Sequence, residues 1–179
     1  LDQAPLMFSK EAVGSKVILE LPTPDGEIKR FNILNAPVFA PELAAKYPQI
    51  RSFAGQGVDD PHAYIRFDLG PKGFHAMILS PNHSTIFIDP FHDKTVNDYI
   101  VYYKKDFIAH NKTMTCDYEA VNKHLLHDTP DLDKAPMNGD CQFRDYRMAL
   151  ACTGEYAQFH GGTVTLVLAA MNTSMTRVN

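Results

Sequence analysis

Short alternating segments joined by tight turns, between residues 63 and 105, restrict the fold more than any other feature of the chain. Every second residue in 63–69 is apolar, which is the pattern of a β-strand that buries one face. The turn sequence Gly70-Pro71-Lys72-Gly73 follows, and residues 74–79 predict a returning strand. Because two further β-prone segments follow at 85–88 and 99–105, spaced by roughly ten to twelve residues, the pattern predicts an antiparallel meander.

The segment before this meander predicts a hairpin and a short helix. Residues 16–34 contain two alternating runs on either side of the turn-forming segment 22–26. Residues 41–47 predict one or two helical turns, because Pro41 suits the first helical position and Glu42 the positive end of the helix dipole. The glycines of Gly55-Gln56-Gly57 are interpreted as a strand bulge or turn. They do not form a phosphate loop, since no Lys-Ser/Thr pair follows them.

Residues 106–140 have little periodicity, and we interpret them as an extended connector in which a processing site would lie. Residues 146–152 alternate again and predict a strand in which Cys152 is buried. After Gly161-Gly162, apolar residues recur at three- and four-residue steps and predict a long helix. The apolar residues of that stripe are Val164, Val167, Leu168, Met171, Met175 and Val178.

These patterns predict an α+β fold, mainly an antiparallel β-sheet of hairpins followed by a C-terminal strand and a long helix. Three regions are expected: a β-rich domain over 1–105, a connector over 106–140 and a separate segment over 141–179. The chain is 45% hydrophobic and 21% charged, values typical of a folded domain. With a net charge of −4 and no apolar run of about 20 residues, we expect neither a nucleic-acid nor a membrane partner.

Two runs near the end of the chain, YRMALACTGEYAQFHGG over 146–162 and AAMNTSMTRVN over 169–179, carry a family resemblance. They resemble the first strand and first helix of the catalytic domain in the reprolysin-like (adamalysin-type) zinc metallopeptidases, a metzincin group, particularly the secreted bacterial members. Residues 52–107 resemble the β-rich prodomain of such precursors. The resemblance implies the zymogen form of a secreted or cell-surface protease. In it the propeptide assists folding and keeps the enzyme latent, and its partner is the catalytic domain of the same precursor.

The zinc motif of that family, H-E-x-x-H, does not occur in this sequence. A catalytic zinc needs three protein ligands and an open position for water, so we expect no peptidase activity from this fragment. The resemblance places zinc, as the cofactor, in the part of the precursor beyond Asn179. Without their usual partners, the strand and helix of 141–179 are expected either to pack on the β-rich region or to exchange with a neighbouring copy.

The three cysteines leave at least one thiol without a partner in the chain. The resemblance implies that a propeptide cysteine ligates the catalytic zinc and displaces its water. Cys116 is the candidate for this role and Cys141 the alternative. Asp117 beside Cys116 opposes thiolate formation, and a Cys116–Cys141 disulfide is the competing interpretation. Cys141 and Cys152 are not expected to pair, because on one extended strand they would lie about 36 Å apart, whereas a disulfide requires about 6 Å.

The remaining candidates have structural interpretations that we favour. The eight histidines are expected on the surface, Glu155 and His160 in packing and capping, and the Asp59-Asp60 pair in a loop instead of a calcium site. The tyrosines at 99, 102 and 103 fit cross-strand packing. If they instead formed a stacking surface, the chain would be a freestanding β-rich binding module for a glycan or a cell-surface partner. This is the alternative function. No nucleophile elbow or carboxylate pair supports a hydrolase.

Overall fold

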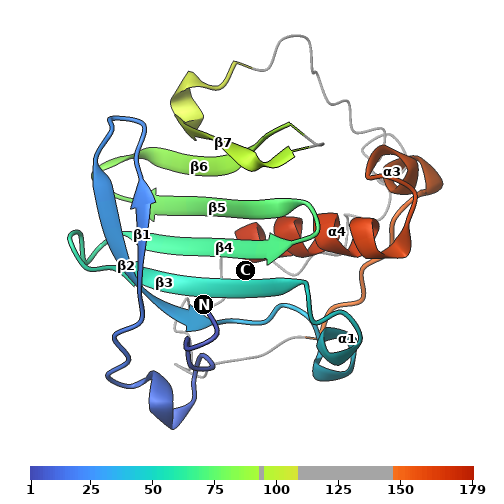
Figure 1. The fold of residues 1–179 in the computed structure, drawn as a ribbon, viewed down its shortest axis with the longest axis horizontal. Helices are drawn as coiled ribbons and strands as arrows, with labels where there is room; N and C mark the ends of the chain where they lie inside the picture. The colour runs from blue at the N-terminus through green and yellow to red at the C-terminus, as the bar shows by residue number, and fades with distance from the viewer. Residues whose placement is uncertain (93–94, 109–146) are drawn as a thin grey trace, which may run out of the picture. The chain divides into compact units, whose positions relative to one another are not determined.

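The computed structural model of the chain describes residues 1–92, 95–108 and 147–179. Its centre is a seven-stranded antiparallel sheet in which the strands follow one another in chain order (Figure 1). The strands are β1 (Ile18–Pro22), β2 (Ile28–Asn35), β3 (Arg51–Gly57), β4 (Tyr64–Gly70), β5 (Gly73–Ser80), β6 (His83–His92) and β7 (Thr95–Tyr103). The predicted antiparallel meander is therefore confirmed.

Two predicted hairpins form for the reasons that their turn sequences suggest. In the β1–β2 turn, Thr23 donates its backbone N–H to the Glu27 carbonyl at 2.8 Å, and Gly26 takes a positive φ of 83°. In the β4–β5 turn, Gly70 pairs with Gly73, whose φ is 97°. Because Pro71 fixes a negative φ in the two-residue loop, the positive φ falls on Gly73, where a residue without Cβ adopts it without strain.

The expectation of a bulge or turn at residues 55–57 is wrong, because these residues are the end of β3. Gly55 is needed for packing and not for a turn. A Cβ atom added there would lie 2.8 Å from the carbonyl oxygen of Asn32, and about as close to the side chains of Ile65 and Ile33, at 3.0 and 3.1 Å. The missing side chain therefore lets β2 approach β3 closely.

The apolar core lies on one face of the sheet. Residues of β1 and β2 share one cluster with residues of β6, and Val101 and Tyr103 of β7 pack against it, so the sheet curls around this face. The rings of Phe53 and Phe67 stack at its centre with centroids 4.8 Å apart. The buried members of the cluster are Ala4, Leu21, Phe31, Ile33, Phe53, Ala63, Ile65, Phe67, Ala76, Ile78, Ile86 and Ile88.

In the described part of the chain the helices are α1 (Pro41–Lys46), α3 (Gly154–Phe159) and α4 (Val164–Val178), with single 3-10 turns at Lys10–Ala12 and Lys104–Asp106. The predicted helix at 41–47 and the long C-terminal helix are confirmed, whereas α3 was not predicted. Both C-terminal helices begin at a threonine cap. Thr153 accepts from the Tyr156 N–H and Thr163 from the Leu166 N–H, each at 3.3 Å.

The strand expected at 146–152 is wrong over its described part, because residues 147–153 have no regular secondary structure and Cys152 is exposed. Alternation supplies a face to bury, but a strand also needs a neighbour for its backbone N–H and C=O groups. None of the seven described strands pairs with this segment. Residues 109–140 of the predicted connector and both candidate zinc ligands, Cys116 and Cys141, lie outside the described residues.

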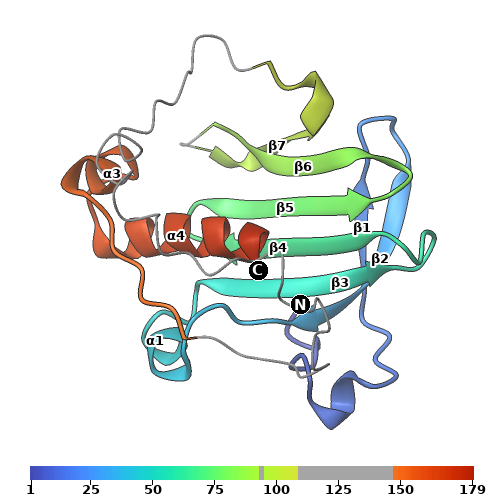
Figure 2. The ribbon, with the colours of Figure 1, turned by 180° about the vertical axis from the view of Figure 1, so that it is seen from behind.

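Helix α4 packs on the sheet face opposite the apolar core, where it contacts β3, β4 and β5 (Figure 2). The sheet, α3 and α4 belong to one compact unit, residues 1–108 and 152–179. Packing on the β-rich region was one of the two outcomes expected for this helix. The predicted apolar stripe is only partly correct. Val167 is buried, but Val164 and Val178 are 65% and 78% exposed, while the polar residues Asn172 and Thr176 are buried.

Candidate functional site

The sheet face beneath α4 carries a row of polar side chains on neighbouring strands. Ser52 of β3 pairs with Asp68 of β4, and Asp68 pairs with His75 of β5. Asp68 is only 3% exposed, although the alternation in β4 predicts a solvent-facing side for it. We define the polar layer as the residues that join this face to α4: Ser52, Asp68, His75, Asp89, Tyr102, Asn172, Thr173, Thr176 and Arg177.

Three buried side chains form a chain of hydrogen bonds at the centre of the polar layer. The Thr176 hydroxyl donates to the Ser52 Oγ at 3.1 Å, and the Ser52 hydroxyl donates to the Asn172 Oδ1 at 2.9 Å. All three residues are at most 2% exposed. Because a buried polar group is costly without a partner, these bonds fix the rotation of α4 about its axis.

Asp68 and His75 lie side by side, and their surroundings favour the neutral form of each. Burial raises the pKa of Asp68 to about 7, although a hydrogen bond from Thr173 at 2.8 Å and the charge of Arg177 act in the opposite direction. Burial also lowers the pKa of His75, whose Nδ1 lies 3.8 Å from the Asp68 carboxyl. Below pH 7, and above the lowered pKa of His75, this contact joins a carboxylic acid to a neutral imidazole.

The C-terminal end of α4 is held by an ion pair. The Arg177 guanidinium binds the Asp89 carboxylate and lies over the Phe87 ring, 5.0 Å from its centroid. The Tyr102 hydroxyl donates to the same carboxylate at 3.1 Å. Burial and the neighbouring Asp89 raise the pKa of Tyr102 to about 12, so this hydroxyl keeps its proton at physiological pH.

The row Ser52, Asp68 and His75 contains the residue types of a hydrolase triad, but its geometry does not fit that chemistry. A catalytic serine donates to a histidine, which an acid then orients. Here the acid lies between the other two, and the Ser52 hydroxyl donates to Asn172. Ser52 is also 2% exposed. The polar layer therefore positions α4, and nothing in it suits nucleophilic attack.

The Asp59-Asp60 pair holds loops together, as its structural interpretation predicts. The Asp59 carboxylate accepts from the Arg30 side chain at 2.6 and 3.1 Å and from its backbone N–H at 2.9 Å. The Asp60 carboxylate accepts from Ser80 at 2.8 Å and Asn82 at 3.0 Å. Hydrogen-bond donors thus occupy both carboxylates, and these bonds tie the β3–β4 loop to strand β2 and to the β5–β6 turn.

The three tyrosines of β7 do not form one surface. Tyr99 and Tyr103 pair with residues of β6 on the core face, whereas Tyr102 pairs with Phe87 on the face of the polar layer. Tyr102 lies 5.7 Å from the Phe87 ring, and Tyr99 lies 6.3 Å from the Phe74 ring. The Tyr102–Phe87 contact is packing between neighbouring strands, and the Tyr99–Phe74 contact reaches across β6 to β5.

The prediction that the histidines lie on the surface is wrong for His75, which belongs to the polar layer. The His160 ring lies 4.3 Å from that of Tyr156, and its Nδ1 lies 3.1 Å from the Lys72 ammonium. Within the described ranges, no group of three or more His, Cys, Asp or Glu side chains is arranged to hold a metal ion. His124 and His127 lie outside them.

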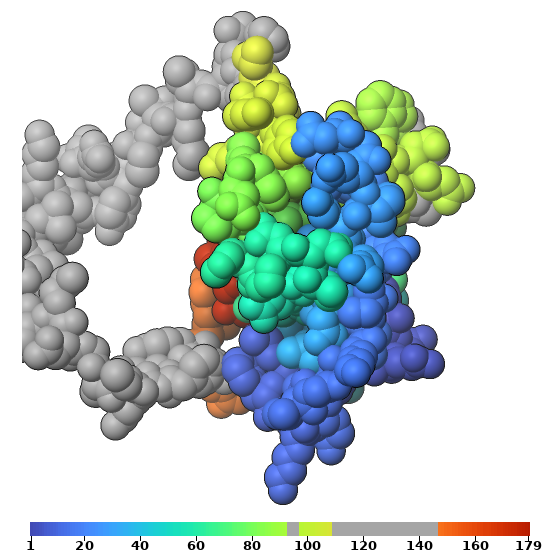
Figure 3. All heavy atoms as spheres, turned by 90° about the vertical axis from the view of Figure 1, so that its left-hand side faces the viewer, coloured from blue at the N-terminus to red at the C-terminus, as the bar shows by residue number. Residues whose placement is uncertain are grey.

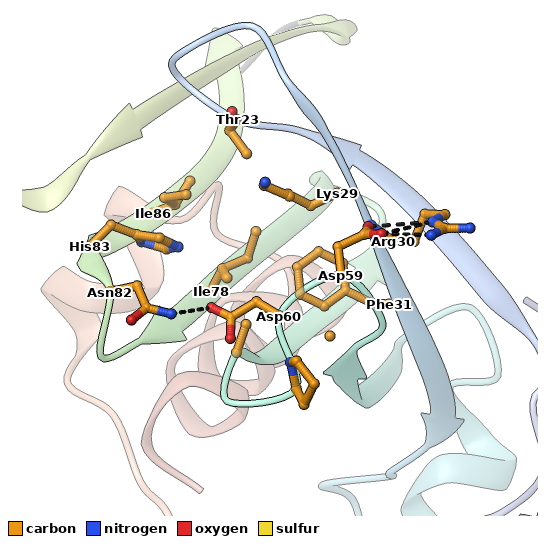
Figure 4. A pocket seen from close by; sticks show the side chains of 13 residues that line it. Thr23, Lys29, Arg30, Phe31, Asp59, Asp60, Ile78, Asn82, His83 and Ile86 are labelled. Atoms are coloured by element: carbon orange, nitrogen blue, oxygen red, sulfur yellow. Dashed lines mark hydrogen bonds and ion pairs between the residues drawn. The ribbon is translucent and has the colours of Figure 1, made fainter.

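A pocket of about 280 Å³ opens at one end of the core face (Figure 4). Its floor belongs to the core, and its rim comes from the β1–β2 hairpin, the β3–β4 loop and the β5–β6 turn. No sequence pattern predicts this pocket. Lys29 and His83 approach it from separate hairpins, and no local pattern connects them.

Comparison with family models, curated proteins and solved structures finds no match to this chain. Among the helices of the described residues, none is both long and apolar enough to cross a membrane.

Proposed function

We propose that this chain is the N-terminal propeptide region of a secreted zinc metalloendopeptidase, with the first segment of the catalytic domain attached. The β-rich part assists folding of the enzyme and keeps it latent, and the fragment itself is not catalytic. The resemblance of residues 146–179 to the start of such a catalytic domain, and of residues 52–107 to such a prodomain, supports this proposal.

The structural observation that carries the proposal is the chemistry of the contact between α4 and the sheet. The main apolar cluster lies on the other face, whereas α4, besides burying Val167, Ala169 and Ala170, is held by hydrogen bonds and by the Arg177–Asp89 ion pair. Contacts between domains are typically more polar than a domain core. The polar layer therefore has the polar character that is typical of a contact between domains.

In this role the sheet would hold the first helix of the enzyme during folding. Small residues of α4, Ala169 and Ala170, are buried at the contact, and Asn172 and Thr176 determine its orientation. The sheet thus offers a template for one orientation of the helix. Zinc, the cofactor of the parent enzyme, would be bound beyond this chain. The two thiols that would reach it, Cys116 and Cys141, are outside the described residues.

The proposal predicts that the intact chain, added in trans, inhibits the mature protease of the same precursor at micromolar concentration. The chain's own α4 competes with the enzyme for the polar layer. Arg177→Ala in the added chain weakens the contact of its own α4 with the sheet, while the enzyme's helix keeps its arginine. Inhibition should therefore strengthen by roughly three- to tenfold. Asp89→Ala weakens both competing helices alike and should leave inhibition nearly unchanged. Peptide-hydrolysis assays measure both effects. Absence of inhibition by the wild-type chain and by Arg177→Ala would contradict the proposal.

A second prediction concerns latency. If Cys116 occupies the open position on the enzyme's zinc, a Cys116→Ser precursor should convert itself to the mature form sooner than the wild type, because a hydroxyl is a weaker zinc ligand than a thiolate. Gel analysis of processing over time measures the difference. Cys141→Ser is the matched comparison. A faster Cys141→Ser precursor would assign the role to that thiol, and unchanged processing of both would exclude a cysteine ligand.

The second candidate is a freestanding β-rich binding module, and the pocket on the core face favours it. The reading frame beyond Asn179 distinguishes the two candidates. A downstream H-E-x-x-H motif supports the precursor, and a stop codon at that point supports the module.

A further inference from the structure

The pocket on the core face combines an apolar floor with a polar rim. Phe31, Ile78 and Ile86 form the floor, and all three belong to the buried core. Thr23 and Lys29 reach the rim from the β1–β2 hairpin, as Figure 4 shows. A volume of about 280 Å³ is just below the usual range for small-molecule sites, so the space suits a ligand of roughly ten non-hydrogen atoms.

The rim is held in place by bonds that do not involve a ligand. Asp59 ties the β3–β4 loop to Arg30 on β2. Asp60 ties the same loop to the β5–β6 turn through Ser80 and Asn82. Three segments distant in the sequence are thus joined around the opening, and Figure 3 shows them meeting at this end of the molecule. Because both carboxylates already accept several hydrogen bonds, they are poor partners for a cationic ligand.

The polar group best placed to bind a ligand is the Lys29 ammonium. It pairs with Glu27 at 2.7 Å, and the two side chains are 39% and 63% exposed. Such an exposed ion pair contributes about 0–1 kcal/mol, so an anion can replace Glu27 at little cost. Lysine has three N–H donors, so the Lys29 ammonium can also bind Glu27 and an anionic ligand at the same time.

Two more groups at the rim lack a full set of partners. The Thr23 hydroxyl is buried, with the residue 8% exposed, and has no hydrogen-bond partner among the described residues, but its oxygen points away from the pocket in Figure 4. His83 donates its Nδ1–H to the Ser84 carbonyl at 2.9 Å, since a carbonyl oxygen only accepts. In this tautomer its second nitrogen is an acceptor, so His83 does not bind an anion directly.

We propose that this pocket binds a small organic monocarboxylate with an apolar body. The carboxylate binds the Lys29 ammonium, and the apolar body lies on Phe31, Ile78 and Ile86. A free acid and the C-terminal carboxylate of a peptide with an apolar last residue share this chemistry. The site is separate from the polar layer, so it does not depend on the precursor function.

The test is a titration of the full chain with 3-phenylpropionate, followed by two-dimensional amide NMR. Saturable shifts are expected at Thr23, Lys29 and the floor residues. The neutral 3-phenylpropionamide should bind about tenfold more weakly or worse, because it lacks the charge. A dipeptide ending in phenylalanine is titrated in the same way, as free acid and as C-terminal amide. Tighter binding of its acid form than of 3-phenylpropionate would identify a peptide C-terminus as the preferred ligand, and weaker binding a small free acid.

Lys29→Met keeps the length of the side chain and removes its charge, and it should weaken binding of the acid by about tenfold. Since Lys29 is partly exposed, this variant should remain folded. Lys46→Met, on the exposed surface of α1, is the matched control and should bind like the wild type. The proposal is overturned if the acid does not saturate below about 10 mM, if acid and amide bind equally, or if both variants behave alike.

Discussion

Replacing Asp68 with asparagine should remove most of the pH dependence of folding stability between pH 3.8 and about 7. In this window the buried carboxyl holds its proton in the folded chain but loses it in the unfolded chain. The folded state therefore binds more protons, and the free energy of unfolding of the wild type falls as the pH rises. At 1.36 kcal/mol per pH unit the total approaches about 4 kcal/mol. Asparagine cannot ionise, so the variant should be the more stable protein at pH 8.

Urea unfolding followed by circular dichroism at a series of pH values measures this difference. The pKa of His75 is lowered, so its contribution has the opposite sign: stability is lost as the pH falls below 6.5 through the lowered value. This part should persist in Asp68→Asn. Asp98→Asn makes the same chemical change at an exposed position of β7 and should follow the wild type. Equal slopes for the wild type and Asp68→Asn would show that Asp68 is not the titrating group.

The second large effect is expected from Gly57→Ala at the end of β3. An added Cβ would lie 2.2 Å from the carbonyl oxygen of Asp60 and 3.1 Å from the Cβ of Ala63. The first distance is to backbone, so the β3–β4 loop itself must move. Such overpacking costs about 3 kcal/mol. The movement would also disturb the pocket rim, because Asp60 belongs to this loop.

The midpoint of thermal unfolding should therefore fall clearly in Gly57→Ala. Gly154→Ala is the control, since a Cβ there meets no atom within 4 Å. Gly154 opens α3, and alanine favours helix over glycine by up to about 1 kcal/mol, so the control should be unchanged or slightly stabilised. If the two variants unfolded at the same temperature, the close approach at Gly57 would not matter for stability.

The strands were predictable because their information is local. Alternation in residues 63–69 and the glycines of the following turn specify β4, the turn and β5 without reference to any distant residue. The long helix was predictable for the same reason, since apolar spacing and a preceding glycine pair are local signals. The same local signal failed at 146–152, where alternation was present but no described strand pairs with it.

The candidate sites were not predictable in this way. Alternation in β4 shows only that Asp68 and Ile65 lie on opposite faces, and it cannot show that a helix more than 90 residues later covers the polar face. The pocket likewise requires three separate turns to meet.

The sequence by itself determined the meander, its turns and the long helix, because hydrophobic periodicity and turn chemistry act between near neighbours. Only the tertiary structure decided which face α4 covers, and with it the burial of Asp68 and His75 and the exposure of Val164 and Val178. The physical reason is that burial depends on what packs against a surface. A polar sheet face is stable in the interior when the helix that covers it carries matching hydrogen-bonding groups. In the sequence, the same residues look like the solvent-exposed face of a strand.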